Sequence, residues 1–502
     1  MVVFKVAFEA LAMLFLMVVL QVLGAPTTTN PSLTYLDLNV HESIATFKSH
    51  PSSHRHLLNT DSISDSQHDG NDSKWKLKLI HRDSISSLLT SKNLSDHRGR
   101  FHDRIKRDVK RVAYLIHRLM INGGNVTNSS SNSSSNTRQP PRYKVTEFGS
   151  DVVSGMDQGS GEYFVRLGVG SPARDQYMVI DSGSDIVWVQ CQPCRQCYKQ
   201  SDPVFDPANS ASYATVTCGS VVCGRVANAN CNAGRCRYEV SYGDGSYTKG
   251  TMALETITFG QTVVRNVAIG CGHWNRGMFV GAAGLLGLGG GLMSFIGQLG
   301  GQTGGTFGYC LVSRGTASQG SLVFGRDAVP VGAVWVPLER NPRAPSFYYV
   351  GLAGLGVGGV KVGTITEDMF RLTENGGGGV VMDTGTAVTR LPLQAYQALR
   401  DAFIEGTAGL ARSSGVSIFD TCFNFFNLNN VRLPTVSFYF SNGPVLTLPA
   451  TNFMIPVDEE GTFCFAFAPS AGISIIGNIQ QEGIQITFDG ANGFVGFGPN
   501  TC

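Results

Sequence analysis

The sequence predicts a mainly β protein of at least two folding units. Its 502 residues exceed what one hydrophobic core usually serves. The composition has 42% hydrophobic residues, 15% charged residues and 61 glycines, which is typical of a turn-rich globular protein and unlike a disordered or fibrous one. One short motif occurs twice, at 179–184 and 381–386: an apolar run, an acid, a hydroxyl residue, a glycine and a second hydroxyl residue.

Short alternating runs separated by glycine predict antiparallel sheets after residue 154. The clearest runs are 163–169, 176–180, 252–259, 437–440, 484–488 and 494–497. One helix is expected at 393–403, because Tyr396, Leu399 and Phe403 share a helical face and Pro392 precedes the first turn.

Each copy of the repeated motif places an acid at the end of an apolar run. A buried strand is expected to end in a tight turn that projects Asp181 in one copy and Asp383 in the other. Two carboxyl groups about 3 Å apart cannot both ionise easily and therefore share one proton. The ionised carboxylate can take a proton from water while the protonated one donates to a peptide carbonyl oxygen. The pair predicts peptide hydrolysis without a metal, a cofactor or a covalent intermediate.

The hydroxyl residues of the two motifs are expected to hold the acids in place. Ser184 and Thr386, three residues after each acid, can hydrogen-bond the carboxylate oxygens and keep the two groups coplanar. Ser182 and Thr384 can tie the two turns together beneath the acids. We therefore expect one site assembled from both halves of the chain.

Further elements follow the acids in a fixed order along the chain. They are Trp188, seven positions after Asp181, the run Tyr242-Gly243-Asp244-Gly245-Ser246, and two apolar-apolar-glycine elements at 285–287 and 475–477. In this combination, residues 160–502 resemble the pepsin-like aspartic peptidases, specifically the plant nepenthesin-like group. The start at 159–163, the Asp-Ser-Gly-Ser-Asp motif and the Gly-Phe-Gly-Pro run at 496–499 look most similar to the plant guard-cell aspartic proteases.

The resemblance implies a bilobal fold with two pseudo-symmetric β lobes and a few short helices. The lobes would span 154–340 and 341–502, with a cysteine-rich insertion at 191–236 in the first. In this family the flap tyrosine, here Tyr242, closes over bound peptide and accepts a hydrogen bond from the tryptophan, here Trp188. The glycines of the flap and the two acid turns, expected at the substrate site, are Gly183, Gly243 and Gly385.

Two positions depart from the family pattern. Ser182 replaces the usual threonine and lacks its methyl group, which predicts a less tightly packed link between the lobes. Asp185 stands where many relatives have serine. If Asp185 is ionised and close to the two acids, it should raise their pKa values and extend activity toward weaker acid, whereas if it points to solvent the effect is negligible.

All twelve cysteines lie between Cys191 and Cys502, and six disulfides are the default expectation for a secreted chain. The run Cys191, Cys194 and Cys197 leaves a metal or cluster site open as an alternative. The family resemblance implies the pairs Cys191–Cys194, Cys197–Cys271, Cys218–Cys236, Cys223–Cys231, Cys310–Cys502 and Cys422–Cys464.

Residues 1–25 predict a cleaved secretory signal, with a membrane anchor as the alternative, although the apolar run is short for a bilayer span. The secretory route points to the extracellular space or apoplast, and the vacuole and endoplasmic reticulum remain open. Five Asn-x-Ser/Thr glycosylation sequons all precede residue 154: Asn71, Asn93, Asn125, Asn128 and Asn132.

Residues 26–153 differ in charge from the rest of the chain. They hold 18 lysines and arginines against 12 acids, whereas 154–502 hold 20 against 24. We expect disorder at 26–73, a strand at 75–80, a basic amphipathic helix at 98–119 and a Ser/Asn linker at 128–137. The resemblance assigns the whole segment as an inhibitory propeptide, with the strand near Leu77 and the basic residues after it covering an acidic cleft.

Two functional classes follow from these observations. The first is a secreted acid endopeptidase made as a zymogen, which acts on protein or peptide substrates and binds its own propeptide. It is expected to be a monomer with no cofactor, no nucleic-acid partner and no stable membrane anchor. A nucleic-acid or membrane-surface role for the basic helix is the alternative for that segment alone. The second class is a catalytically silent, xylanase-inhibitor-like binding protein on the same fold, whose members typically lack part of the catalytic apparatus.

Overall fold

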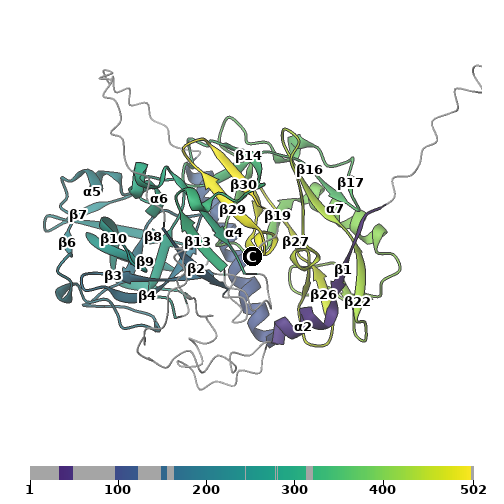
Figure 1. The fold of residues 1–502 in the computed structure, drawn as a ribbon, viewed down its shortest axis with the longest axis horizontal. Helices are drawn as coiled ribbons and strands as arrows, with labels where there is room; N and C mark the ends of the chain where they lie inside the picture. The colour runs from purple at the N-terminus through teal and green to yellow at the C-terminus, as the bar shows by residue number, and fades with distance from the viewer. Residues whose placement is uncertain are drawn as a thin grey trace, which may run out of the picture.

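The computed structural model of the chain describes residues 33–48, 97–122, 148–154, 163–242, 245–277, 279, 281–312 and 320–498. Two lobes of β-sheet lie side by side, with further strands joining them and the long helix α4 (His97–Asn122) crossing between them (Figure 1). The mainly β, two-lobed architecture is therefore confirmed. Across these residues, no helix combines the length and apolar character needed to cross a bilayer.

The N-terminal lobe is built around a hairpin of two long strands, β9 and β10, which pair antiparallel. Its strands are β3 (Tyr163–Val169), β4 (Arg174–Asp181), β5 (Trp188–Gln190), β6 (Ala214–Thr215), β7 (Asn230–Asn232), β8 (Arg235–Ser241), β9 (Tyr247–Phe259), β10 (Thr262–Arg276) and β11 (Gly284–Gly287). Two short helices, α5 (Val221–Arg225) and α6 (Phe295–Leu299), belong to the same half of the chain. Strand β4 pairs antiparallel with β3 and parallel with β11, so the run that ends at Asp181 lies inside the sheet.

A central group of strands joins the two lobes. It contains β2 (Phe148–Ser154), β12 (Thr306–Cys310), β13 (Gly320–Phe324), β14 (Val334–Glu339), β29 (Gln485–Asp489) and β30 (Phe494–Phe497). Strand β2 pairs with β13 and, at its end, with β3. The expected boundary between residues 153 and 154 thus falls inside a strand of the body, and the sheet begins at Phe148.

The C-terminal lobe repeats the arrangement of the first around its own acid. Its strands are β15 (Tyr348–Val350), β16 (Leu352–Val357), β17 (Val360–Lys361), β18 (Val380–Met382), β19 (Thr389–Pro392), β20 (Arg412–Ser413), β21 (Cys422–Asn424), β22 (Asn430–Pro434), β23 (Val436–Phe440), β24 (Val445–Thr447), β25 (Met454–Pro456), β26 (Thr462–Phe465), β27 (Phe467–Ser470) and β28 (Ser474–Ile476). Strand β18 pairs antiparallel with β15 and parallel with β28. The expected helix is α7 (Leu393–Gly406), whose Phe403 stacks on Phe465 in the core.

Short 3-10 helices complete the connections in both lobes. They are η3 (Pro207–Asn209), η4 (Gly300–Thr303), η5 (Arg326–Ala328), η6 (Glu367–Phe370), η7 (Ala450–Asn452) and η8 (Asn478–Gln481). The strands expected from the sequence are present, and β3 and β30 have the expected bounds.

The leader contains more structure than its composition indicates. Disorder was expected throughout 26–73, but β1 (Tyr35–Asn39) and α2 (Val40–Lys48) form there, and β1 pairs antiparallel with β22. The physical reason is that Leu38 and Val40 are each only 1% exposed, so this short apolar run gains enough burial to order. The signal segment 1–25, the expected strand at 75–80, the linker at 128–137 and all five sequons lie outside the described residues.

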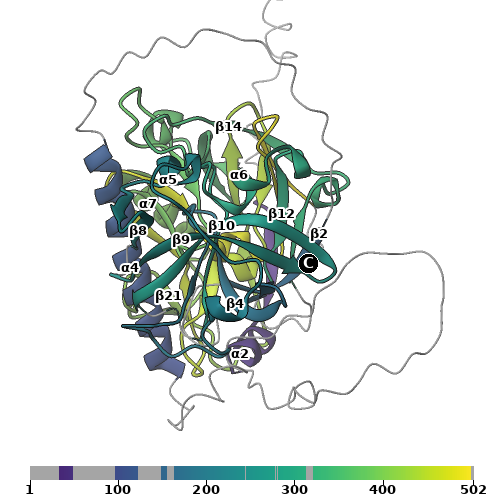
Figure 2. The same ribbon diagram turned by 90° about the vertical axis from the view of Figure 1, so that its left-hand side faces the viewer.

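The basic amphipathic helix is present as α4, and it lies along one side of the body (Figure 2). Phe101, Ile105, Val112 and Leu115 are buried against the C-terminal lobe. Val109 has the same helical spacing but is 42% exposed, because the buried face of α4 runs through Ile105, Asp108 and Val112 and leaves Val109 at its edge.

Four of the six implied disulfides are wrong. The structure pairs Cys191 with Cys271, Cys194 with Cys197, Cys218 with Cys231 and Cys223 with Cys236, in place of Cys191–Cys194, Cys197–Cys271, Cys218–Cys236 and Cys223–Cys231. Cys422–Cys464 is present as expected, and in Cys310–Cys502 the second residue lies outside the described part. The Cys-x-x-Cys-x-x-Cys run is thus fully engaged in disulfides.

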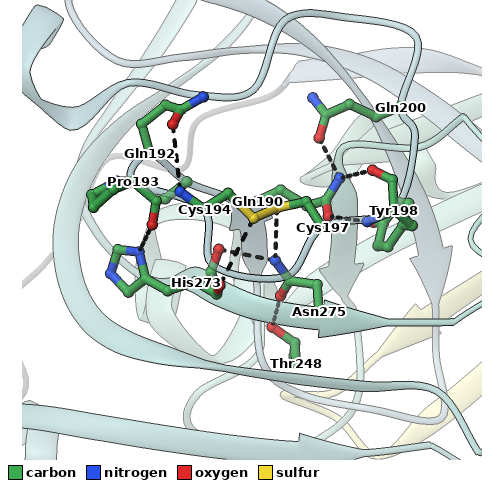
Figure 3. Close-up of a disulfide and its surroundings, with 12 residues drawn as sticks. Gln190, Gln192, Pro193, Cys194, Cys197, Tyr198, Gln200, Thr248, His273 and Asn275 are labelled. Atoms are coloured by element: carbon green, nitrogen blue, oxygen red, sulfur yellow. Dashed lines mark hydrogen bonds between the residues drawn. A yellow bond between two sulfur atoms is a disulfide. The ribbon is translucent and has the colours of Figure 1, made fainter.

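Strand register explains the first two exchanges. Strand β5 runs parallel to β10, and the amide of Cys191 donates to Gly272 O at 2.9 Å, which brings Cys191 beside Cys271 in the core. Cys194 and Cys197 are then left to close their own short loop, whose surroundings include His273 and Asn275 (Figure 3).

Burial explains the second two exchanges. Helix α5 holds Cys223 on the core side, where Cys236 is also buried. Cys231 is exposed and pairs with Cys218 on the outer side of the insertion. Spacing alone contains no information on which cysteine faces inward.

Candidate active site

The two acid turns meet at the junction of the lobes, as their strands dictate. Strand β4 ends at Asp181 and β18 ends just before Asp383, and both carboxyl groups are at most 1% exposed. The turn amides point at their own acids: Gly183 N donates to Asp181 Oδ1 at 3.1 Å, and Gly385 N donates to Asp383 Oδ1 at 3.0 Å. The two halves of the site are therefore built alike.

Both turns require glycine because of close approach across the junction. A Cβ atom at Gly183 would lie 2.7 Å from Asp383 Oδ1, and a Cβ atom at Gly385 would lie 2.2 Å from the guanidinium of Arg111. A side chain at either position would thus occupy the space between the two acids.

The hydroxyl residues lie where the sequence predicts. Ser184 Oγ donates to Asp181 Oδ2 at 2.6 Å, and Thr386 Oγ1 donates to Asp383 Oδ2 at 2.5 Å. Beneath the acids, the amide of Ser182 donates to Thr384 Oγ1, and the amide of Thr384 donates to Ser182 Oγ, both at 3.0 Å. This reciprocal pair joins the lobes with buried hydrogen bonds, and the serine at position 182 still makes it.

The apolar-apolar-glycine elements pass beneath the acid turns. Leu288 N donates to Asp181 O at 2.9 Å directly after β11, and Asp383 N donates to Ile476 O at 3.2 Å in β28. Asn478 Nδ2 also donates to Thr384 O at 2.8 Å. These bonds fix the backbone of each turn and hence the direction of its carboxyl group.

The hairpin between β8 and β9 places Tyr242 near the N-terminal acid. Trp188 Nε1 donates to the Tyr242 hydroxyl at 2.7 Å, and Phe279 packs edge-on against both rings. Burial raises the pKa of Tyr242, and the negative charge of Asp181 raises it further, so its hydroxyl keeps its proton. Gly243, at the expected flap tip, lies outside the described residues.

Asp185 does not point freely into solvent, which was the second of the two expected alternatives, and its effect on the acid pair stays a prediction. Its Oδ1 accepts from the amide of Gly291 at 3.1 Å, and its Oδ2 accepts from Ser346 Oγ at 2.5 Å. The carboxyl group therefore ties a loop after β11 to the segment that leads into β15.

Arg111 of α4 occupies the space between the two acids. Its Nη2 donates to Asp181 Oδ1 at 2.7 Å and to Asp383 Oδ1 at 2.9 Å, and its Nε donates to Asp383 Oδ2 at 3.1 Å. Because one nitrogen bonds both carboxylates, the two acids face each other within reach of a single bridging group. The arginine side chain is 17% exposed.

The charges at the site act on one another strongly. Burial raises the pKa of Asp383, Arg111 lowers it, and the negative charge of Asp181 raises it again, with a net upward shift. Burial lowers the pKa of Arg111, but the charges of Asp181 and Asp383 outweigh it and raise that pKa well above its ordinary value. Arg111 is therefore a permanent cation beside Asp383, a carboxyl group whose pKa stays raised in spite of that charge.

A second polar contact fixes α4 one helical turn before Arg111. Asp108 Oδ1 accepts from the amides of Ala387 at 2.6 Å and Val388 at 3.3 Å, and Asp108 also forms a buried ion pair with Arg390. These residues directly follow the second acid motif. The helix thus bonds both the acids and the turn that carries one of them.

Sequence reasoning did not single out Asp108, Arg111 or Arg390. One signal was present: Asp108 stands three residues after Ile105 and four before Val112, inside the apolar stripe of the expected helix. A buried acid in such a stripe requires a polar partner in the body. The apolar stripe predicts which face of the helix is buried, but it does not predict where along the body the helix docks, and that position places Arg111 over the acids.

Two protein families match the chain over most of its body. The family described as xylanase inhibitor N-terminal matches residues 163–326, and the one described as xylanase inhibitor C-terminal matches 347–499. Protein ASPARTIC PROTEASE IN GUARD CELL 2 of Arabidopsis thaliana is 68% identical over 86% of this chain and 89% of its own. The chain belongs to the plant pepsin-like aspartic proteases.

Other relatives agree with this membership. Aspartic proteinase nepenthesin-2 of Nepenthes gracilis is 39% identical over 71% of this chain and 82% of its own. Among solved structures, basic 7S globulin from soybean superposes with a TM-score of 0.57 at 20% identity, covering 71% of this chain and 97% of its own, which shows the fold alone. The resemblance to the nepenthesin-like group and to the guard-cell proteases is confirmed, and this plant aspartic protease is an aspartic-type endopeptidase that acts on peptide substrates.

Proposed function

We propose that the chain is a secreted zymogen of an acid endopeptidase, in which Asp181 and Asp383 activate water between them. The observation that carries the proposal is the paired geometry of the acids: both bond one guanidinium nitrogen, and each is held by its own hydroxyl residue and turn amide. With Arg111 withdrawn, the same oxygens can hold a water molecule and share one proton. One carboxyl then takes a proton from water as the other donates to the scissile carbonyl oxygen.

The inhibited state follows from the same contacts. Arg111 occupies the position that the hydrolytic water needs, and α4 lies across the junction where substrate would bind. Its positive charge also favours two ionised carboxylates, whereas catalysis needs one of them protonated. Helix α4 therefore supports latency in two ways, by filling the site and by changing its protonation.

The secretory route supports the rest of the proposal. Disulfides are typical of proteins that fold in an oxidising compartment, and the described cysteines are all paired. We propose the apoplast as the destination of a monomeric enzyme, with the vacuole and the endoplasmic reticulum as the other compartments on the same route.

A xylanase-inhibitor-like binding protein is the second candidate, because both matching families are described by that name. Such a protein needs no proton-sharing acid pair. The complete set of acids, hydroxyl residues, Tyr242 and Trp188 in this chain favours the enzyme.

Incubation of the processed protein with denatured haemoglobin or casein distinguishes the two candidates. Cleavage at pH values of about 3–5 that pepstatin blocks is the expected result, since a coupled carboxyl pair works in that range. Absence of cleavage at every pH, together with tight binding of a xylanase, would establish the inhibitor instead.

We expect acid to release α4. Arg111 lowers the pKa of Asp383, so Asp383 has a lower affinity for protons with α4 in place than with α4 withdrawn. The bonds from Arg111 to the ionised acids therefore stabilise the docked position of α4 fully at neutral pH. This stabilisation is lost as pH falls into the weakly acidic range above the ordinary aspartate pKa, where Asp383 takes up a proton. Hydrogen-exchange protection of α4 amides, corrected for intrinsic rates, should decrease between pH 7 and pH 4, while protection of α7 stays constant. A parallel loss in both helices would contradict a specific release.

We expect the N-terminus of the active enzyme to lie between Asn128 and Phe148. The Ser/Asn linker is open to proteolysis by its composition, and β2 pairs with β13 and β3, so retaining Phe148 preserves the central sheet. N-terminal sequencing of the acid-activated protein checks this. A first residue before position 74 would leave α4 attached, and one after Ser154 would remove β2.

A further inference from the structure

The leader contacts the body at a second place, far from the acids. Strand β1 pairs with β22 through five residue pairs from Tyr35 opposite Pro434 to Asn39 opposite Asn430. Figure 1 shows β1 on the outer side of the C-terminal lobe, whereas α4 lies between the lobes. Nothing in peptide hydrolysis requires this contact.

The contact has the features of a built binding site for an extended peptide. Within the described part of the chain, β22 has β1 as its sole ladder partner. The ladder is extended at both ends, where Val40 N donates to Asn429 O at 2.9 Å and Thr435 N donates to Thr34 O at 3.0 Å. Backbone pairing at an open sheet edge is a recurring mode of peptide recognition.

Side chains add specificity to this ladder. Leu38 and Val40 are each 1% exposed and belong to the main core cluster of the body. Thr34 Oγ1 lies 2.8 Å from Thr435 Oγ1, and the guanidinium of Arg432 lies 4.7 Å from the centre of the Tyr35 ring. The site therefore recognises an extended strand with apolar side chains at alternate positions, followed by a short helix.

Gly358 and Gly359 shape the start of the site. Both have positive φ angles, +63° and +81°, and the Cβ atoms they lack would lie 2.7 Å from Leu33 and from Thr34. Thr34 N donates to Gly358 O at 2.7 Å. The glycine pair thus lets the peptide approach the backbone closely.

We propose that the β22 edge is a peptide-binding site that retains residues 33–48 as a separate, non-covalently bound chain after the leader has been cut. Removal of β1 would expose the backbone of β22 and the core positions under Leu38 and Val40. An exposed edge strand of this kind pairs readily with other chains, so retention of β1 also protects the enzyme from association. After cleavage, α4 would dissociate from the acid site, whereas β1 and α2 (Val40–Lys48) would remain bound to the C-terminal lobe.

Retention of residues 33–48 after natural cleavage rests on the proposed function, in which the leader is cut. The experiment that tests the binding site uses an introduced cut and does not depend on that function. The full chain with Asp181→Asn, which removes self-cleavage, receives a recognition sequence for an external protease in place of residues within 61–70. Cutting there separates β1 and α2 covalently from α4 and the body. The N-terminal fragment should co-elute with the body in gel filtration at neutral pH.

Substitutions then test whether the described contacts hold the fragment. Leu38→Ala should weaken retention by at least about 30-fold, since it empties a fully buried leucine site. Asp37→Ala is the matched control on the exposed side of the same strand, and it should retain the fragment as well as the unchanged sequence does. Release of the unchanged fragment, or equal retention of the Leu38→Ala fragment, would overturn the proposal.

A competition experiment avoids any effect of Leu38→Ala on folding of the whole chain. An excess of synthetic peptide with the sequence of residues 33–48 should displace the labelled fragment from the cut protein. The same peptide with Leu38→Ala should not. Equal displacement by a scrambled peptide would mean that the β22 edge binds strands without recognising this one, and the proposal would fail.

Discussion

Replacement of either acid by asparagine, Asp181→Asn or Asp383→Asn, should abolish peptide hydrolysis by the processed enzyme, with kcat reduced at least about 10³-fold. The amide keeps the size of the side chain, but it can neither accept a proton from water nor share one with its partner. Initial rates of cleavage of a short fluorogenic peptide at pH values of about 3–5 measure the effect.

Asp185→Asn is the matched control for this experiment. It removes a carboxylate four residues from Asp181 that accepts hydrogen bonds from Gly291 N and Ser346 Oγ. We expect its kcat to stay within a few-fold of the unchanged enzyme. If either variant of the acid pair cleaved peptide at the normal rate, the site would lie elsewhere.

The same substitutions should have opposite effects on stability in the two forms of the protein. In the full chain, each acid is a partner of the buried cation Arg111, so its removal should lower the midpoint of thermal unfolding. In the processed enzyme, each acid repels the other, and its removal should leave the midpoint unchanged or raise it. The contrast between the two forms separates the inhibitory contact from catalysis.

The acid turns could be predicted from the sequence because each is a local structure. An apolar strand, an acid, a hydroxyl residue and a glycine determine the conformation of one turn, and two copies determine the pair. The hydrogen bonds of Ser184 and Thr386, and the reciprocal bonds of Ser182 and Thr384, follow from that local geometry and from the pseudo-symmetry of the lobes.

The parts that could not be predicted depend on contacts between distant segments. The partner of Cys191 is decided by the parallel register of β5 and β10, and the position of Arg111 is decided by where α4 docks on a lobe that begins more than 200 residues later. The strand β1 lies in a polar segment and could not be predicted, because its five residues hold one fully buried apolar side chain, Leu38, and gain their order from pairing with β22 and not from their own propensity.

The Arg111→Met substitution should convert the full chain from a latent to an open form. Methionine keeps the apolar stem of the side chain but lacks the guanidinium, so it leaves two buried carboxylates without their cation. Removing one partner of a buried ion pair costs about 3–5 kcal/mol, which corresponds to a shift of at least about 100-fold toward the open form. The variant should cleave a fluorogenic peptide before its leader is cut, and its processing at acid pH should be faster by a similar factor.

Lys110→Met provides the matched control, because Lys110 is an exposed neighbour on the same helix and its substitution removes the same charge. It should remain latent, since the loss of one surface charge changes the attraction between leader and body only slightly. Equal activation of the two variants would mean that overall charge, and not the position of Arg111 between the acids, holds the helix in place. Latency in the Arg111→Met variant would assign inhibition to the coverage of the junction by α4 and to the bonds of Asp108, which fix the helix independently of the acid pair.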